Sequence, residues 1–318
     1  MLMNIAILTS GGDAPGMNVA IRAAVRYGLQ KGHKMFGVIN GYRGLFNGEI
    51  IELNHKSVSG IISRGGTVLK TARMTEFREE KNMLIAIENL KKLDIEALIV
   101  IGGDGSYRGA MKLNQLGLKT IGIPGTIDND IYGTDFTLGF NTAVETIVDA
   151  IDKLRDTSQS HQRCSIIEVM GRKCGDLALY SAISGGAEFL ITPEHPVDKG
   201  HIIDKLKKYK QAERTHAIVV VTEKMFDVHE FANEITEKSK FTSRATVLGY
   251  IQRGGSPSPE DRILGSKMGT YAIDLLDQGI RGVGIGVRAN QMTHMSFERI
   301  LTSEREYNQL YSLVGKIA

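Results

Sequence analysis

Short runs of apolar, mostly β-branched residues recur along this chain, with helical patterns between them. The runs are largely continuous rather than alternating, as in strands that are covered on both faces. In one intervening segment, residues 140–154, apolar side chains recur three and four positions apart, which predicts a helix with one apolar stripe. Alternating strands and helices predict an α/β fold with mainly parallel sheets. The predicted strands are residues 5–8, 97–101, 120–123, 166–170, 189–191, 218–221 and 245–248.

Loops rich in glycine and aspartate follow the first three of these strands. They are residues 11–13, 102–106 and 124–130. Glycine lets backbone N–H groups approach phosphate oxygens and turn through positive φ, helix N-termini add favourable partial charge, and aspartates hold Mg²⁺ or accept a proton. Because the carboxyl ends of parallel strands gather along one sheet edge, we expect the three loops to converge. The pattern predicts a phosphoryl-transfer site.

Composition limits the other classes of function. A chain of 318 residues with 42% hydrophobic content suits two lobes. The net charge of +3 is small, and the densest basic run, residues 205–210, lies on a helical pattern that also carries acidic residues, so a solvated helix face is favoured over nucleic-acid binding. The two cysteines and eight histidines lack zinc-binding spacing. No apolar stretch approaches membrane-spanning length, and we expect a cytoplasmic protein without membrane contact.

Each motif also has a plainer interpretation. The turn at residues 102–106 occurs in other metabolite and lipid kinases and can be a simple tight connection, while Asp128 and Asp130 could be turn caps. The chain contains neither a P-loop nor a protein-kinase catalytic loop. However, Asp128 and Asp130 follow a strand of buried type and share the expected sheet edge with Asp104, which favours a Mg²⁺ ligand together with a proton acceptor.

Five motifs in this order resemble bacterial ATP-dependent 6-phosphofructokinase. They are residues 8–18, 101–106, 124–130, 170–172 and 252–257, and the resemblance extends from about residue 5 to about residue 286. It implies transfer of the ATP γ-phosphoryl group to the 1-hydroxyl of fructose 6-phosphate, the committed step of glycolysis, with Mg²⁺ as cofactor and ATP as co-substrate. It also implies two Rossmann-like three-layer lobes. These are an ATP-binding lobe, 1–138 plus 251–301, and a fructose 6-phosphate-binding lobe, 139–250 plus 302–318.

The resemblance assigns roles to individual residues. Asp128 would accept the proton from the sugar hydroxyl, Arg172 would stabilise charge on the moving phosphoryl group, and Asp130 would tune the charge of the Asp128 loop, which Thr126 and Ile127 place. The implied ATP-binding residues are Gly12, Arg73, Met74, Gly103, Asp104, Gly105 and Ser106, of which Asp104 would hold Mg²⁺. The implied substrate-binding residues are Thr126, Ile127, Asp128, Arg163, Met170, Gly171, Arg172, Glu223, Arg244, Tyr250, Ile251, Gln252 and Arg253.

In the family, Arg163 and Arg244 come from a neighbouring subunit, so the resemblance implies a homotetramer with shared active sites. Tyr250 stands where the family usually has a histidine, and a neutral phenol offers one hydrogen bond without charge. Met74 stands where an aromatic side chain is common beside the nucleotide, and a thioether stacks less well there.

The resemblance also implies an allosteric effector site, at Arg22, Arg26, His55, Arg155, Gly186, Glu188, Arg214 and His216. His55, Gly60 and Ala212 replace an arginine, an aspartate and a lysine common in the family. The loss of cationic groups that an anionic effector would use predicts weakened effector control.

The phosphoryl donor depends on two positions. Pyrophosphate-dependent relatives carry aspartate at the place of Gly105 and lysine at the place of Gly125, and both are glycine here, which favours ATP. The alternatives are a pyrophosphate-dependent phosphofructokinase, a lipid or dinucleotide kinase, and a non-catalytic sugar-phosphate or nucleotide sensor. The presence of Asp104, Asp128 and Arg172 argues against a sensor, because such proteins typically lose their catalytic carboxylates.

Overall fold

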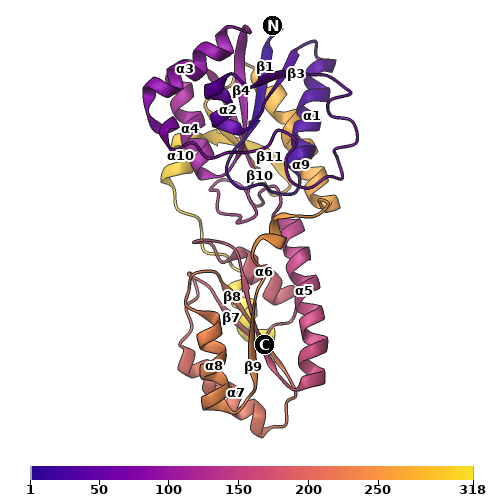
Figure 1. Cartoon of the computed structure of the whole chain (residues 1–318), viewed down its shortest axis with the longest axis vertical. Helices are drawn as coiled ribbons and strands as arrows, with labels where there is room; N and C mark the ends of the chain where they lie inside the picture. Colours follow the sequence, from indigo (N-terminus) through magenta and orange to yellow (C-terminus); the bar gives the residue numbers. More distant parts are fainter. Residues whose placement is uncertain (1, 318) are drawn as a thin grey trace. The chain divides into compact units, whose positions relative to one another are not determined.

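Residues 2–317 are described in the computed structural model, and they form two units. Unit 1 comprises residues 2–142 and 253–305, and unit 2 comprises residues 143–252 and 306–317. Both units are α/β structures with mainly parallel sheets, so the predicted fold class is confirmed (Figure 1).

Unit 1 is built on a seven-stranded sheet with the strand order β11-β10-β5-β4-β1-β2-β3. The pairs β2–β3 and β10–β11 are antiparallel, and the other neighbours are parallel. Its strands are β1 (Asn4–Thr9), β2 (Lys34–Val38), β3 (Ile50–Leu53), β4 (Ile95–Gly102), β5 (Lys119–Pro124), β10 (Val283–Arg288) and β11 (Gln291–Ser296). Its helices are α1 (Met17–Gln30), α2 (Gly41–Asn47), η1 (Thr75–Arg78), α3 (Glu80–Lys91), α4 (Asp104–Gln115), α9 (Pro259–Asp277) and α10 (Phe297–Thr302).

Helices cover both faces of this sheet, as the continuous apolar strands require. Helices α1 and α9 pack together on one side, and α2, α3, α4 and α10 lie on the other (Figure 1). Helix α9 begins with a strong local signal, since the Ser258 hydroxyl accepts the Asp261 N–H and Pro259 occupies the first turn.

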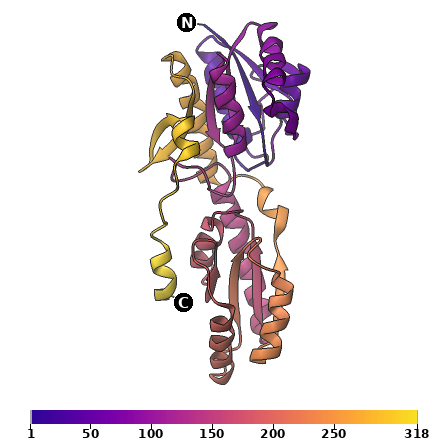
Figure 2. The same cartoon turned by 90° about the vertical axis from the view of Figure 1, so that its left-hand side faces the viewer.

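Unit 2 contains a four-stranded parallel sheet with the order β7-β8-β6-β9. Its strands are β6 (Cys164–Val169), β7 (Phe189–Ile191), β8 (Ala217–Thr222) and β9 (Ser243–Val247). Its helices are α5 (Phe140–His161, whose first three residues belong to unit 1), α6 (Asp176–Ser184), α7 (Lys199–Gln211), α8 (Val228–Ser239), η2 (Gly249–Arg253, ending in unit 1) and α11 (Tyr311–Ile317). Helix α11 packs on α6 (Figure 2).

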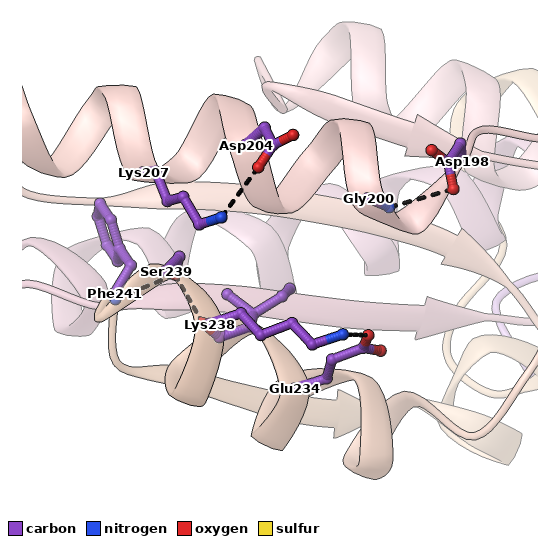
Figure 3. A network of polar contacts seen from close by, with 9 residues as sticks. Asp198, Gly200, Asp204, Lys207, Glu234, Lys238, Ser239 and Phe241 are labelled. Atoms are coloured by element: carbon purple, nitrogen blue, oxygen red, sulfur yellow. Dashed lines mark hydrogen bonds and ion pairs between the residues drawn. The ribbon is translucent and has the colours of Figure 1, made fainter.

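The outer surfaces of α7 and α8 carry paired charges (Figure 3). Lys207 Nζ lies 3.0 Å from Asp204 Oδ1, and Lys238 Nζ lies 2.6 Å from Glu234 Oε1. Asp198 caps α7 by accepting the Gly200 N–H at 3.2 Å. Exposed pairs within one helix contribute little stability, so these surfaces are solvated helix faces.

Tyr107 in α4 is a fully buried polar side chain of the unit 1 core. Its ring is fully buried and packs edge-on against Phe297, with 5.2 Å between ring centroids. Within residues 2–317 its hydroxyl has no hydrogen-bond partner. Burial raises the pKa of Tyr107 well above its ordinary value, so the hydroxyl is a neutral, desolvated polar group.

Tyr107→Phe is therefore expected to stabilise unit 1. The substitution keeps the ring and removes the desolvated hydroxyl, and we expect the free energy of unfolding to rise by about 1 kcal/mol. Chemical denaturation measures the change. Tyr42→Phe is the matched control, because the Tyr42 hydroxyl is also buried but donates to the Ser106 carbonyl oxygen at 2.6 Å, and its loss should destabilise by about 1 kcal/mol. Equal destabilisation by both substitutions would contradict this assignment.

Candidate functional site

The first three strand-end loops lie side by side in unit 1. Strands β1, β4 and β5 are adjacent and parallel, so their carboxyl ends share one edge of the sheet. Beyond the strands the loops stay linked, since the Ser10 N–H donates to Ile101 O at 2.9 Å and the Gly125 N–H donates to Gly102 O at 3.1 Å. The structure thus brings together the three motifs that the sequence places far apart.

The glycines of these loops serve two different purposes. Gly11 adopts φ +88°, as expected for a turn through positive φ. The expectation of positive φ is wrong for the second turn, where Gly102, Gly103 and Gly105 all have ordinary negative φ. At Gly102 glycine is needed for space, because a Cβ would collide with the Ser10 carbonyl oxygen and the Ser106 side chain.

The loop that carries Asp128 is fixed by its own hydrogen bonds. Asp128 is 5% exposed, and its N–H donates to Thr126 Oγ1 at 3.2 Å. Asn129 adopts φ 53°, and its side chain accepts the Thr137 N–H at 2.9 Å and donates to Asp135 O at 3.1 Å. Asn129 is a structural residue that the motifs did not predict, although the tolerance of asparagine for left-handed turns was a signal for it. This network fixes the backbone of the loop that carries Asp128.

Asp104 begins helix α4 at the end of the second loop, where the helix N-terminus favours anions. A cavity of about 230 Å³ in unit 1 is lined by Asp104 and Asp130, and by Arg108, Tyr132 and Arg305 among others. Two carboxylates on one cavity fit Mg²⁺, which proteins usually hold through one or two carboxylates and substrate phosphates. Within the described residues no group of three or more His, Cys, Asp or Glu side chains could hold a metal alone. An ion here would take its remaining ligands from phosphate oxygens and water.

Arg73, Met74 and Arg253 lie in the same unit as these loops. The Arg73 carbonyl accepts a hydrogen bond from Arg43 Nη2 at 2.6 Å, which ties its loop to α2, and Met74 packs on the core. The Arg253 guanidinium lies against Gly12, with Cζ 3.1 Å from where a Cβ of residue 12 would stand. Arg253, assigned to the sugar phosphate by resemblance, is therefore next to the first phosphate-type loop.

In unit 2 the loop after β6 gathers five of the candidate substrate residues. The Arg172 N–H donates to Glu223 Oε1 at 3.1 Å, and the Met170 N–H donates to Gln252 Oε1 at 3.1 Å. Gly171 and Arg172 both adopt positive φ, 139° and 57°. Close by, burial raises the pKa of Glu168, and the negative charges of Glu223 and Asp227 add to the effect.

Arg163 and Arg244 are not brought to this loop within one chain. Arg163 directly precedes β6, and Arg244 on β9 pairs with Ser165 near the start of β6, whereas Arg172 follows the other end of that strand. A strand of this length spans roughly 20 Å. Tyr250 and Ile251, in η2, are exposed by 78% and 59%.

The candidate effector residues fall into two groups. In unit 2, Arg155 Nη2 donates to Gly186 O at 2.9 Å, and Arg155 Nη1 lies 3.4 Å from His216 Nε2. Glu188 accepts the Ile218 N–H at 2.7 Å, and Arg214 stacks over Tyr209 at 4.2 Å. Arg22, Arg26 and His55 belong to unit 1, where burial and then the charge of Arg26 lower the pKa of Arg22.

None of the described helices combines the length and the apolar character needed to span a membrane.

Solved structures of phosphofructokinases resemble this chain throughout its length. The chain is 34% identical to phosphofructokinase from Saccharomyces cerevisiae, with a TM-score of 0.86. The matched region covers 99% of this chain and 46% of the yeast chain. For Pichia pastoris phosphofructokinase the identity is 31% and the TM-score is 0.88. The matched region covers 100% of this chain and 39% of the Pichia chain. The chain thus spans less than half the length of these two relatives.

Lower identity accompanies a similar fold in another group. A pyrophosphate-dependent phosphofructokinase from Marinobacter aquaeolei is 20% identical, with a TM-score of 0.84. The matched region covers 96% of this chain and 86% of the Marinobacter chain. At this identity the likeness shows the shared fold alone. The family model described as phosphofructokinase matches residues 4–276. The chain therefore belongs to the phosphofructokinase family.

Proposed function

We propose that this chain is an ATP-dependent 6-phosphofructokinase, which transfers the γ-phosphoryl group of ATP to the 1-hydroxyl of fructose 6-phosphate in glycolysis. The observation that carries the proposal is the convergence of the three glycine- and aspartate-rich loops at one edge of the unit 1 sheet. Such an arrangement offers backbone N–H groups, a helix N-terminus and carboxylates to one small region, which phosphoryl transfer requires.

Each group then has one task. The turns at Gly12 and Gly103–Ser106, with Arg73 and Met74, bind ATP, and Asp128 accepts the proton of the sugar hydroxyl. Arg172 stabilises the charge of the moving phosphoryl group, while Met170, Gly171, Glu223 and Gln252 surround the sugar. Asp104 holds Mg²⁺ when it is bound, and the ion neutralises charge on the phosphates.

The donor assignment rests on two glycines. A Cβ at Gly105 would meet no atom within 4 Å, so this position leaves open the space that a nucleotide needs. A Cβ at Gly125 would lie 2.9 Å from both Ile101 Cγ2 and Met17 Cε, so the lysine found in pyrophosphate-dependent relatives does not fit here without a shift of the core. Both observations favour ATP over pyrophosphate.

A shared active site is part of the proposal. Arg163 and Arg244 lie at the end of the unit 2 sheet opposite Arg172. This position supports the proposal that they bind the substrate of a neighbouring subunit in a cytoplasmic homotetramer. The groups near Arg155 and Arg22 would form a weakened effector site.

The deciding experiment measures initial rates of fructose 1,6-bisphosphate formation with Mg-ATP or pyrophosphate as donor. Activity with ATP alone supports the proposal. Activity with pyrophosphate alone would overturn the donor assignment and make the protein a pyrophosphate-dependent phosphofructokinase. If intact protein has no activity with either donor, the kinase proposal fails and a sugar-phosphate sensor becomes the better interpretation.

Gly105→Asp tests the donor site directly. Because the position is open, the fold should survive, but a carboxylate beside the ATP phosphates adds repulsion of about 1 to 4 kcal/mol, depending on solvent exposure. We expect the KM for ATP to rise at least about fivefold with little change in the KM for fructose 6-phosphate. Gly105→Asn is the isosteric neutral control. An equal rise in both variants would show that volume rather than charge is responsible.

A further inference from the structure

The Arg172 loop of unit 2 adopts a conformation that its own sequence does not favour. Arg172 is left-handed at φ 57°, and a Cβ at Gly171 would collide with the Cys174 carbonyl oxygen. For a non-glycine residue such backbone costs roughly 1 to 2 kcal/mol, so restraints on the loop help to maintain it. Glu223 restrains one end of the loop by accepting the Arg172 N–H. The restraint at the other end comes from residues that have no assigned role.

Glu194 provides this second restraint. Both of its carboxylate oxygens accept the Gly175 N–H, each at 3.0 Å. Gly175 is the N-cap of α6 and ends the loop that carries Arg172. A carboxylate at a helix N-terminus also gains from the local partial charge. Glu194 thus fixes the point where the loop becomes helix.

Tyr311 holds Glu194 in place from the C-terminal segment. Its hydroxyl lies 2.8 Å from Thr192 Oγ1 and donates to Glu194 Oε2 at 3.2 Å. The side chain is 6% exposed, and burial raises the pKa of Tyr311, so the phenol stays protonated and able to donate. A Cβ at Gly175 would lie 2.5 Å from the Tyr311 oxygen, so the hydroxyl closes directly over the end of the loop.

A second contact joins the same segment to α6. Asn308 Nδ2 donates to Asp176 Oδ1 at 3.2 Å, and Asp176 is the first residue of the helix. The C-terminal segment therefore meets the α6 N-terminus through two side chains, Asn308 and Tyr311, which lie three residues apart at the start of α11.

We infer that Glu194 and Tyr311 are positioning residues that hold the Arg172 loop in its active conformation. The inference rests on the proposed function for its catalytic consequence. Its structural part, that the Tyr311 hydroxyl restrains the loop, stands independently.

Two readouts on Tyr311→Phe test the inference. The substitution keeps the ring, which stacks on Tyr307 and His195, and removes only the hydroxyl. Cys174 lies inside the loop and is 5% exposed, whereas Cys164 in β6 is fully buried, so thiol labelling followed by mass spectrometry reports the loop against an internal reference. We expect Cys174 to react about tenfold faster, Cys164 to be unchanged, and kcat to fall about tenfold.

A double-mutant cycle separates positioning from general destabilisation. If Tyr311 acts through Arg172, Tyr311→Phe should have no further effect on kcat in an Arg172→Ala background. Tyr307→Phe is the matched control, since Tyr307 is 60% exposed in the same segment, and it should change neither readout.

The outcomes are distinguishable. Unchanged Cys174 labelling in Tyr311→Phe overturns the inference whether or not the enzyme is active. Faster labelling with independent, multiplicative effects of the two substitutions on kcat overturns the link to Arg172. A wild-type protein without kinase activity overturns the proposed function, and the labelling still decides whether Tyr311 restrains the loop.

Discussion

Asp128→Asn is expected to lower kcat for fructose 6-phosphate phosphorylation by roughly 10²- to 10⁴-fold, the contribution typical of general base catalysis. An amide cannot accept the proton of the sugar hydroxyl, whereas its size matches that of the carboxylate. The loop should keep its conformation, because the Asp128 backbone N–H, Thr126 and Asn129 all make hydrogen bonds that an amide at position 128 leaves in place.

The KM for ATP should change little in this variant, since the nucleotide is proposed to bind the two neighbouring loops. Steady-state kinetics and thermal unfolding, measured on the same preparation, separate catalysis from folding. Asp152→Asn is the matched control, because Asp152 is an exposed aspartate on helix α5. A kcat within a factor of about three of wild type would remove Asp128 from the role of base, since a lost base costs far more.

Arg172→Ala should lower kcat by about 10³-fold, because a transition-state arginine is worth 10³ or more in phosphoryl transfer. Arg172→Lys should recover only part of the loss, since an ammonium lacks the planar fork that binds two phosphoryl oxygens together. Lys173→Ala is the matched control, as Lys173 is the next residue and is likewise exposed.

The division of the Arg172 effect between kcat and KM is the informative measurement. An interaction made only in the transition state lowers kcat and kcat/KM equally. A rise in the KM for fructose 6-phosphate at unchanged kcat would instead make Arg172 a residue for ground-state substrate binding, in conflict with its proposed role.

Much of the fold follows from local pattern. Strands β1, β4 and β8 are continuous apolar runs buried on both faces, and the sequence predicts them. The remaining strands of the unit 1 sheet, β2, β3, β10 and β11, were not predicted, and β2 is a short run that contains a glycine. β3 is short and partly exposed, β10 contains two glycines, and β11 is largely polar, so propensity and pattern are weak there.

The candidate site also has parts that the sequence predicts and parts that it does not. The adjacency of the Gly12, Asp104 and Asp128 loops could be predicted because parallel strands bring their carboxyl ends to one edge. The contacts of Glu194 could not be predicted, since Gly175 and Tyr311 lie 19 and 117 residues away in the sequence and no motif links them. Such pairs depend on tertiary packing.

The order in which the units are completed during synthesis follows from their boundaries. The unit 2 sheet uses only strands between Cys164 and Val247, whereas the unit 1 sheet needs β10 and β11, which end at Ser296. The whole unit 2 sheet therefore leaves the ribosome first. At that point β5 of unit 1 still lacks its neighbour β10. Because β5 has an unpaired edge in that interval, the nascent chain is most exposed to misassociation just before β10 emerges.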